Sequence, residues 1–238
     1  MNLLLLEPDE LSPDGTARLS GRRLVHAREV LAVQAGDRLR AGVVGGDVGA
    51  AEVLALDDAA LHLRVTLTDP PPPRPGIDLV LAMPRPKAWK RILPVVAQLG
   101  VDRLVLVNAA RVEKSYFSSP ALSDGTLRRL LVEGLEQARD TVLPEVLVRE
   151  RFRPFVEDEL DGLFPAPARR LLAHPHAETP LDAVPDAART VLAVGPEGGW
   201  VPFELDLLAA HGFLPFSLGP RVLRTETLVP YLIGAIRA

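Results

Sequence analysis

The chain has 238 residues, of which 47% are hydrophobic and 24% charged, and its formal net charge is −4. These values are ordinary for a globular protein with one large domain or two smaller ones. The chain contains no cysteine, which excludes disulfides, zinc–thiolate sites and thiol nucleophiles. No apolar run approaches the roughly 20 residues of a membrane span, and "MNLLLLEP" is too short for a signal peptide. We therefore expect a cytoplasmic protein with no membrane partner and no metal.

Residues 1–69 consist of short apolar segments separated by Gly and Asp turn signals. The segment "LHLRVTL" alternates apolar and polar residues with period two, as a half-buried strand does. "RRLVHAREVLAV" is the one helix-like stretch between them. This pattern predicts a small β-barrel, with strands at 2–7, 17–21, 37–46, 48–56 and 60–68. The same residues hold 7 Lys and Arg against 11 Asp and Glu, so no overall basic field attracts nucleic acid.

The proline run in "TDPPPPRPG" predicts a semi-rigid linker at 70–76, because consecutive prolines favour an extended chain that cannot join a sheet. Beyond it, at 77–238, strand-like and helix-like segments alternate. This alternation predicts an α/β domain with a parallel sheet covered on both faces. The expected strands are 77–84, 103–108, 169–175, 189–196 and 213–220, and the expected helices are 87–100, 123–142, 202–212 and 226–238.

Two unusual loops follow predicted strands, where parallel sheets bind ligands. In "GPEGG" (195–199) the glycines let a ligand approach the backbone closely, although a tight turn without a ligand explains this loop alone equally well. In "LGPRVLRTET" (218–227) Arg221 and Arg224 stand beside a helix start that Thr225 or Thr227 would cap. A surface pair between Arg224 and Glu226 is the alternative. Together the two loops suggest two walls of one pocket.

The pair "GPEGGW" and "LGPRVLRTET" closely resembles the ribosomal RNA small subunit methyltransferase E family of the SPOUT superfamily. Enzymes of that family form N3-methyluridine in 16S rRNA with S-adenosyl-L-methionine. The segments "LSGRRLVHAREVLAVQAGDRL", "QLGVDRLVLV", "GLEQARDTVLPEV" and "LAHP" are similar to further family segments. The resemblance implies an N-terminal PUA-like, RNA-binding β-barrel, a C-terminal α/β domain with a deep trefoil knot, and a homodimer.

The resemblance also implies site residues. Knot loops of the superfamily hold the cofactor largely through backbone groups, which fits the glycines of the first loop. The implied cofactor-binding residues are His174, Pro175, Gly195, Pro196, Glu197, Gly198, Gly199, Leu218, Gly219, Pro220, Val222, Leu223 and Arg224. The implied RNA-binding residues are Arg22, Arg23, His26, Arg111 and Lys114.

Three positions depart from the family pattern: Ala32 and Asp140 replace arginines, and Gln98 replaces an acid. The segment "RVEKSYF" (111–117) also differs, and its basic and aromatic residues suit RNA phosphates and bases. A surface loop with one buried aromatic is the alternative for this segment. The departures bear on the RNA substrate rather than on the cofactor site.

The chemistry of N3 methylation asks for a cation near O2 or O4 of the uracil, where negative charge develops. Arg224 is the first candidate and Arg221 the second. Glu197 either orients the glycine loop or complements the positive sulfonium, and His174 is a weaker candidate for a proton acceptor. An RNA-binding protein of the same fold without catalysis is the other hypothesis. A nucleotide-dependent α/β enzyme is disfavoured, because the phosphate-loop motifs are missing.

Overall fold

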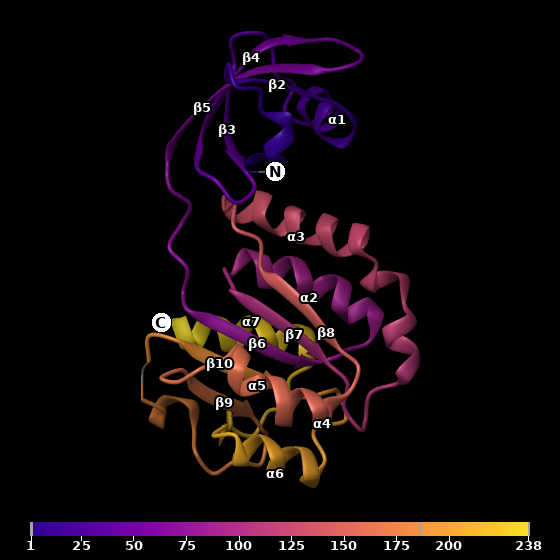
Figure 1. Ribbon diagram of the computed structural model, residues 1–238. Coiled ribbons are helices and arrows are strands. Elements are labelled where there is room, and N and C mark those ends of the chain that lie inside the picture. The colour runs from indigo at the N-terminus through magenta and orange to yellow at the C-terminus, as the bar shows by residue number, and fades with distance from the viewer. Residues whose placement is uncertain (1, 186, 238) are drawn as a thin grey trace. The chain divides into compact units, whose positions relative to one another are not determined.

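The computed structural model describes residues 2–185 and 187–237, which form two compact units. The first unit contains the chain up to Pro73 together with Val132–Leu143. The second contains Arg74–Leu131 and the chain from Pro144 onward. Figure 1 shows the helices and strands of both units. The mixed α/β class predicted from the sequence is confirmed, while the predicted boundaries at 69/70 and 76/77 stay a prediction.

The first unit is built on a five-stranded sheet with the order β1-β3-β4-β5-β2. β1 pairs with β3 in parallel, and the other neighbours are antiparallel. One face packs on helix α1 and carries the unit's apolar core, which includes Leu19, Leu24, Leu61 and Leu63. The elements are β1 (Leu4–Leu6), β2 (Thr16–Leu19), α1 (Gly21–Glu29), β3 (Arg38–Val43), β4 (Val48–Leu56) and β5 (Leu61–Asp69), with a short turn of helix at Pro8–Glu10.

The later segment Val132–Leu143 is fastened to this unit by buried polar contacts. Glu136 is 2% exposed, and its carboxylate accepts hydrogen bonds of 3.0 and 3.1 Å from Arg22. The amide of Gly45 donates to the carbonyl of Thr141 at 2.8 Å. Burial raises the pKa of Glu136, and Arg22 opposes that rise. Since the ion is buried, the guanidinium of Arg22 is what makes its burial tolerable.

The second unit is built on six parallel strands in the order β11-β9-β10-β6-β7-β8. Every residue of β6 and β10 is buried, which explains their continuous apolar runs. Helices α2 and α7 pack against each other. The strands are β6 (Ile77–Ala82), β7 (Arg103–Val107), β8 (Glu145–Arg149), β9 (Arg169–Ala173), β10 (Thr190–Val194) and β11 (Leu214–Phe216).

The four predicted helices of the second unit begin and end close to the predicted bounds. The main helices are α2 (Pro86–Gln98), α3 (Asp124–Ala138, which continues into the first unit), α6 (Pro202–Ala210) and α7 (Thr225–Arg237). Residue 238, the predicted end of the last helix, lies outside the described residues. Short helical turns occur at Lys114–Ser118, Pro120–Leu122 and Leu181–Ala183. The sequence analysis missed β8 and the continuous helical segment formed by α4 (Phe152–Pro154), a π-helical turn (Phe155–Glu159) and α5 (Leu160–Leu163).

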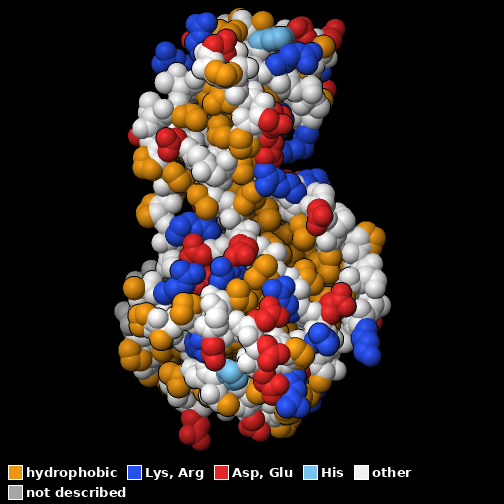
Figure 2. All heavy atoms as spheres, in the orientation of Figure 1, with side chains coloured by type: hydrophobic (Ala, Val, Ile, Leu, Met, Phe, Trp, Pro, Cys, Tyr) orange, Lys and Arg blue, Asp and Glu red, His pale blue; other side chains and the backbone are white. Residues whose placement is uncertain are grey.

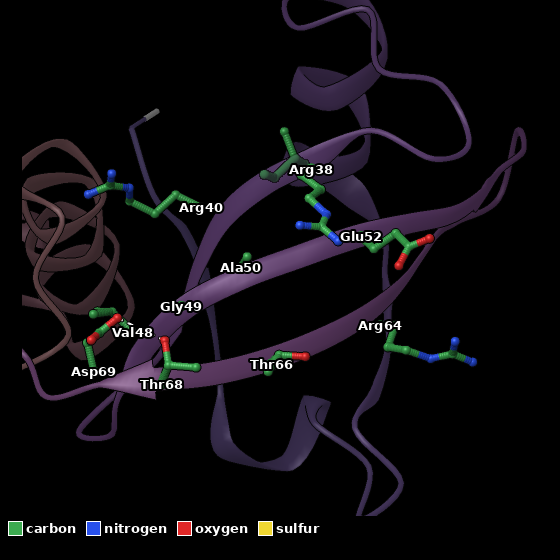
Figure 3. A pocket seen from close by; sticks show the side chains of 11 residues that line it. Arg38, Arg40, Val48, Gly49, Ala50, Glu52, Arg64, Thr66, Thr68 and Asp69 are labelled. Atoms are coloured by element: carbon green, nitrogen blue, oxygen red, sulfur yellow. Dashed lines mark hydrogen bonds between the residues drawn. The ribbon is translucent and has the colours of Figure 1, made fainter.

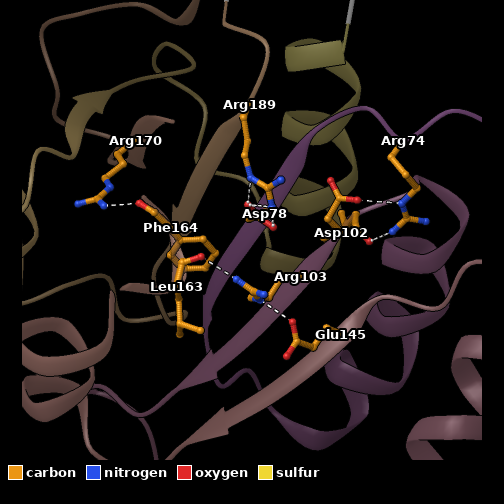
Figure 4. Close-up of polar contacts among 10 residues, drawn as sticks. Arg74, Asp78, Asp102, Arg103, Glu145, Leu163, Phe164, Arg170 and Arg189 are labelled. Carbon is orange, nitrogen blue, oxygen red and sulfur yellow. Dashed lines mark hydrogen bonds and ion pairs between the residues drawn. The ribbon is translucent and has the colours of Figure 1, made fainter. Parts of the chain in front are cut away.

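Ion pairs secure the end of this sheet where the strands begin (Figure 4). Asp78, at the start of β6, is fully buried and accepts two hydrogen bonds of 2.8 and 3.0 Å from Arg189. Arg103, at the start of β7, donates to Glu145 at 2.6 Å and to the carbonyl of Leu163 at 2.7 Å. Arg74 donates to Asp102 at 3.0 Å. These pairs lie where the strands begin, and the loops that follow the strands lie at the opposite, carboxyl ends.

Charges of both signs alternate over the second unit on the face drawn in Figure 2, so neither sign dominates there. No helix of the described residues is long and apolar enough to cross a membrane.

The buried pair of Asp78 and Arg189 predicts an asymmetry between two variants. Burial raises the pKa of Asp78 while Arg189 opposes the rise, so ionised Asp78 depends on that guanidinium. Arg189→Gln should cost about 3 kcal/mol of unfolding free energy at pH 7, because it leaves a buried charge unpaired. Asp78→Asn should cost clearly less, since the Arg189 side chain is 47% exposed and keeps its hydration. Urea denaturation measures both.

The pH dependence provides the check on that prediction. A carboxyl with a raised folded-state pKa favours the fold while protonated, and this contribution is lost as the pH rises through the folded pKa. The deficit of Arg189→Gln should therefore shrink on acidification toward the ordinary pKa of aspartate. A deficit that grows at low pH, or equal costs for the two variants, would contradict the assignment.

Candidate functional site

The three predicted cofactor segments follow three adjacent strands. His174 and Pro175 come directly after β9, residues 195–199 come directly after β10, and residues 218–224 come after β11. β9 lies between the other two strands. Adjacent strands are about 4.8 Å apart, so the three loops leave one edge of the sheet within about 10 Å of one another.

The glycine loop after β10 requires glycine at two positions, at one because of its backbone conformation and at the other because of a close contact. Gly199 has a φ of +75°, and its amide donates to the carbonyl of Pro196 at 2.8 Å, which closes a tight turn. A Cβ on Gly195 would lie 2.9 Å from Nε1 of Trp200. The glycine at 195 therefore allows an aromatic ring to pack directly on the backbone.

Trp200 is a residue of this site that the sequence analysis did not select. It is 4% exposed, and its ring lies 5.6 Å from that of Phe152. Within the described part of the chain, its buried Nε1 has no hydrogen-bond partner. The tryptophan stands in the quoted motif, but a single apolar ring carries no chemical signature that would have separated it from the core.

Two carboxylates fasten the glycine loop to neighbouring loops. Glu197 accepts a hydrogen bond of 3.2 Å from the amide of Arg85, the residue before α2. Glu204 is 2% exposed and accepts from the amides of Val201 at 2.9 Å and Ala110 at 2.7 Å. These contacts join the loops that follow β6, β7 and β10.

The segment 111–117 also reaches the glycine loop. The guanidinium of Arg111 donates to the carbonyl of Gly198. Burial and a hydrogen bond with Glu113 raise the pKa of Tyr116, and Arg85 and Glu197 lie near enough to affect it as well. Lys114 is exposed at the start of a helical turn. The structure thus brings a predicted RNA segment to a predicted cofactor loop.

The loop after β11 presents exposed cations beside a helix start. Arg221 and Arg224 are both exposed, and the carbonyl of Arg224 accepts from Thr227 at 2.9 Å and Leu228 at 2.8 Å as α7 begins. Glu226 lies 3.9 Å from Arg91. The carboxylate that was the alternative partner of Arg224 therefore pairs with a different arginine, on α2.

A hollow of about 780 Å³ adjoins this loop. Leu218 and Gly219 line it together with Pro180, Leu181 and Tyr231. Val222 is 83% exposed, and Pro220 is exposed while Leu223 is half-buried.

His174 is tied to β11 through its backbone, since its amide donates to the carbonyl of Phe216 at 2.9 Å. Its half-buried ring meets the ring of His176 edge-on at 5.7 Å. Burial, followed by the charge of His176, lowers the pKa of His174. The lowered pKa favours the neutral form of the ring.

The other three predicted RNA-binding residues lie on α1 in the first unit. Arg22 is bound to Glu136, and Arg23 donates to Glu10 at 2.6 Å and to the carbonyl of Leu5 at 3.0 Å. Nε2 of His26 is buried without a hydrogen-bond partner among the described residues, and burial lowers its pKa. Both arginines thus have partners within the fold, and their contact with RNA stays a prediction.

Among residues 2–185 and 187–237, no group of three or more His, Asp or Glu side chains is arranged to hold a metal ion. The candidate site thus consists of the loops after β9, β10 and β11, two carboxylates and four cations. The carboxylates are Glu197 and Glu204, and the cations are Arg111, Lys114, Arg221 and Arg224.

Comparisons with known proteins identify the family of this chain. Residues 71–237 match the family model of an RNA methyltransferase domain. The Ribosomal RNA small subunit methyltransferase E of Treponema pallidum is 33% identical over 95% of this chain and 87% of its own length. The protein of the same name from Mycobacterium bovis is 30% identical over 99% of this chain and 92% of its own length.

A solved structure shares the fold over the whole chain. It is the Ribosomal RNA small subunit methyltransferase E from Neisseria gonorrhoeae bound to S-adenosyl methionine, which matches with a TM-score of 0.81 and 23% identity. The alignment covers 100% of this chain and 97% of the Neisseria chain. The family model and these relatives show that the chain belongs to the RNA methyltransferase domain family, among the ribosomal RNA small subunit methyltransferase E proteins.

Proposed function

We propose that this protein is an rRNA methyltransferase that uses S-adenosyl-L-methionine to methylate N3 of a uridine in 16S rRNA of the small ribosomal subunit. The observation that carries the proposal is the meeting of three loops, one rich in glycine and one rich in arginine, at one edge of a parallel sheet. The names of the relatives and the cofactor of the Neisseria structure support it.

The loops suit the cofactor because they offer backbone rather than bulky side chains. Gly199, at a φ of +75°, closes the turn without a side chain, and Gly195 admits the ring of Trp200, whose Nε1 has no hydrogen-bond partner among the described residues. When bound, the cofactor supplies an electrophilic methyl group on a sulfonium. The residues proposed to hold it are His174, Pro175, the loop 195–199, Leu218, Gly219, Pro220, Val222, Leu223 and Arg224.

The chain's own cations prepare the acceptor. N3 of uracil is protonated at neutral pH and lies on the base-pairing edge, so the base must be unpaired or flipped out. Arg224, exposed at the start of α7, stabilises the negative charge that develops on O2 or O4 as N3 loses its proton. Arg221 is the second candidate for this role.

Glu197 acts by positioning. One of its oxygens is engaged by the amide of Arg85, so the carboxylate holds the glycine loop against the loop before α2. We propose that Arg111, which contacts the carbonyl of Gly198, and the exposed Lys114 bind RNA phosphates next to the cofactor.

The architecture proposed for the enzyme is a PUA-like, RNA-binding barrel at 1–69, a linker at 70–76 and a SPOUT domain with a trefoil knot at 77–238. We also propose a cytoplasmic homodimer. Exposed apolar side chains on the second unit support a partner surface there, with Leu214 at 57%, Val222 at 83% and Tyr231 at 55%.

The direct test of this function is methyl transfer. The protein should transfer labelled methyl groups from S-adenosyl-L-methionine to small subunits isolated from a strain that lacks its gene. Mass mapping of the product should find N3-methyluridine in 16S rRNA. Methylation of another atom would reject the N3 assignment, and the absence of binding heat with the cofactor would favour the RNA-binding protein without catalysis.

Arg224→Ala should lower kcat at least about 100-fold, because it removes a cation from the developing charge. The fold should persist, since the side chain is exposed. Arg153→Ala is the matched control, because Arg153 is exposed and its ion pair among the described residues is with Glu157, four residues later. Wild-type kcat in the Arg224 variant would remove Arg224 from the mechanism.

Gly195→Ala should weaken binding of S-adenosyl-L-methionine about tenfold, because the new methyl group would force Trp200 or the loop to move. Calorimetry measures the affinity, and circular dichroism reports whether the fold is retained. Gly125→Ala on α3 is the control, since a Cβ there meets nothing within 4 Å. An unchanged affinity at position 195 would show that the cofactor does not depend on this packing.

A further inference from the structure

The sheet of the first unit carries arginines on the face opposite its apolar core. Successive residues of a strand point to opposite faces, so the neighbours of buried Ala17, Ala41, Leu63 and Val65 point outward. We call this outer surface the arginine face; it consists of Arg18 on β2, Arg38 and Arg40 on β3, Arg64 and Thr66 on β5, and Ala50 and Glu52 on β4. All four arginines are exposed.

Strand register arranges these side chains in two rows. Arg38, Glu52 and Arg64 lie directly opposite one another across β3, β4 and β5, and Arg40, Ala50 and Thr66 form the next row. The strand spacing separates Arg38 from Arg64 by about 10 Å, and Arg40 follows Arg38 by about 7 Å along β3. One acid therefore stands among several cations.

The rows border a hollow of about 660 Å³ (Figure 3). The hollow forms because small residues, Gly49 and Ala50, lie near the start of β4. A Cβ on Gly49 would lie 2.1 Å from the carbonyl oxygen of Thr66, so β5 comes too close to Gly49 for any side chain. Asp69 lines one end of the hollow, where Thr68 donates to it at 2.8 Å.

The arginines of this face have no direct ion-pair partner among the described residues, unlike the other arginines at 1–69. Arg22, Arg23 and Arg28 each pair with a carboxylate. For the side chains of Arg18, Arg38, Arg40 and Arg64, by contrast, the described residues provide no hydrogen bond or ion pair within contact distance. Four of the seven basic residues at 1–69 thus gather on one surface without a direct hydrogen bond or ion pair, although the charge of Arg64 is near enough to contribute to the lowered pKa of Asp14.

We infer that the arginine face binds the phosphate backbone of RNA and is the main RNA contact of the first unit. This inference rests on the proposed function for the class of ligand. Guanidinium groups donate two parallel hydrogen bonds to phosphate, and the hydroxyl of Thr66 is a further donor of the kind that contacts nucleic-acid backbones. The arginines of this face add to the RNA contacts predicted for Arg22 and Arg23, which stay a prediction.

A protein partner fits this surface less well. Protein interfaces depend on aromatic or large apolar side chains buried at their centre. The centre of this hollow holds Gly49 and Ala50, and no aromatic residue lines it. Leu39 and Val48 are its only large apolar lining residues among those described, and a shallow hollow edged by arginines suits a polyanion instead.

The test compares two double variants with the full-length protein. Arg40→Gln with Arg64→Gln removes one cation from each side of the hollow. Arg28→Gln with Arg153→Gln removes two arginines that already pair with Asp58 and Glu157, and so matches the charge change. Binding of a fluorescein-labelled RNA hairpin is followed by anisotropy over a range of salt concentrations, and methyl transfer to small subunits gives KM and kcat.

For the Arg40/Arg64 variant we expect Kd and KM about tenfold higher and a salt slope smaller by about 2, with kcat within about twofold of wild type. The matched control should keep the wild-type slope. Replacement of the same two arginines by lysine should restore most of the affinity, because ammonium groups still bind phosphate. Glu52→Gln should bind RNA more tightly than wild type, since it removes the acid between Arg38 and Arg64.

Wild-type Kd and salt slope in the Arg40/Arg64 variant, with circular dichroism unchanged, would overturn the inference, as would an equal loss in the matched control. Recovery by lysine separates a loss of charge from a loss of fold. The proposed function is judged separately. If RNA binding depends on the arginine face but the wild-type protein transfers no methyl group, the inference about the face holds and the proposed activity is rejected. If the wild-type protein transfers methyl groups and the Arg40/Arg64 variant has an unchanged KM, the activity holds and the inference about the face is rejected.

Discussion

The parallel direction of all six strands is the constraint on which the second unit depends. It sends every strand end to one edge of the sheet, and the order β11-β9-β10 makes three loops neighbours although they are far apart in sequence. Short polar contacts then fix the loops: Glu204 joins Val201 to Ala110, and Glu197 joins the glycine loop to Arg85. The site is thus assembled mainly by backbone groups and two carboxylates.

The beginnings and the ends of the strands in this sheet have different roles. Where the strands begin, arginines form ion pairs with carboxylates, as Arg189 does with buried Asp78. Where they end, Arg221 and Arg224 remain exposed beside a helix start. The first unit repeats this division, because Arg22 and Arg23 hold the fold while Arg38, Arg40 and Arg64 face solvent. Pairing with a carboxylate, rather than residue type or exposure, distinguishes a structural arginine from one available to a ligand.

Much of the fold follows from periodicity, and the failures have physical reasons. β6 and β10 were predictable because fully buried strands are continuously apolar. β8 was missed because it lies at the edge of the sheet and is only half-buried, so its sequence "EVLVR" shows little contrast. The glycine and arginine loops were recognisable as motifs. The packing of Trp200 on Gly195, and the partners that engage Arg22 and Arg23, depend on contacts distant in sequence that no local pattern encodes.

The membership of Val132–Leu143 in the first unit has a consequence for synthesis of the chain. The five strands of that unit are translated first, yet the carboxylate that receives Arg22 is 114 residues further along. At about 5–20 residues per second, the ribosome needs several seconds to pass from Pro73 to Leu143. During that interval the nascent unit has all five strands but lacks Val132–Leu143, so its completion waits for part of the methyltransferase domain to emerge.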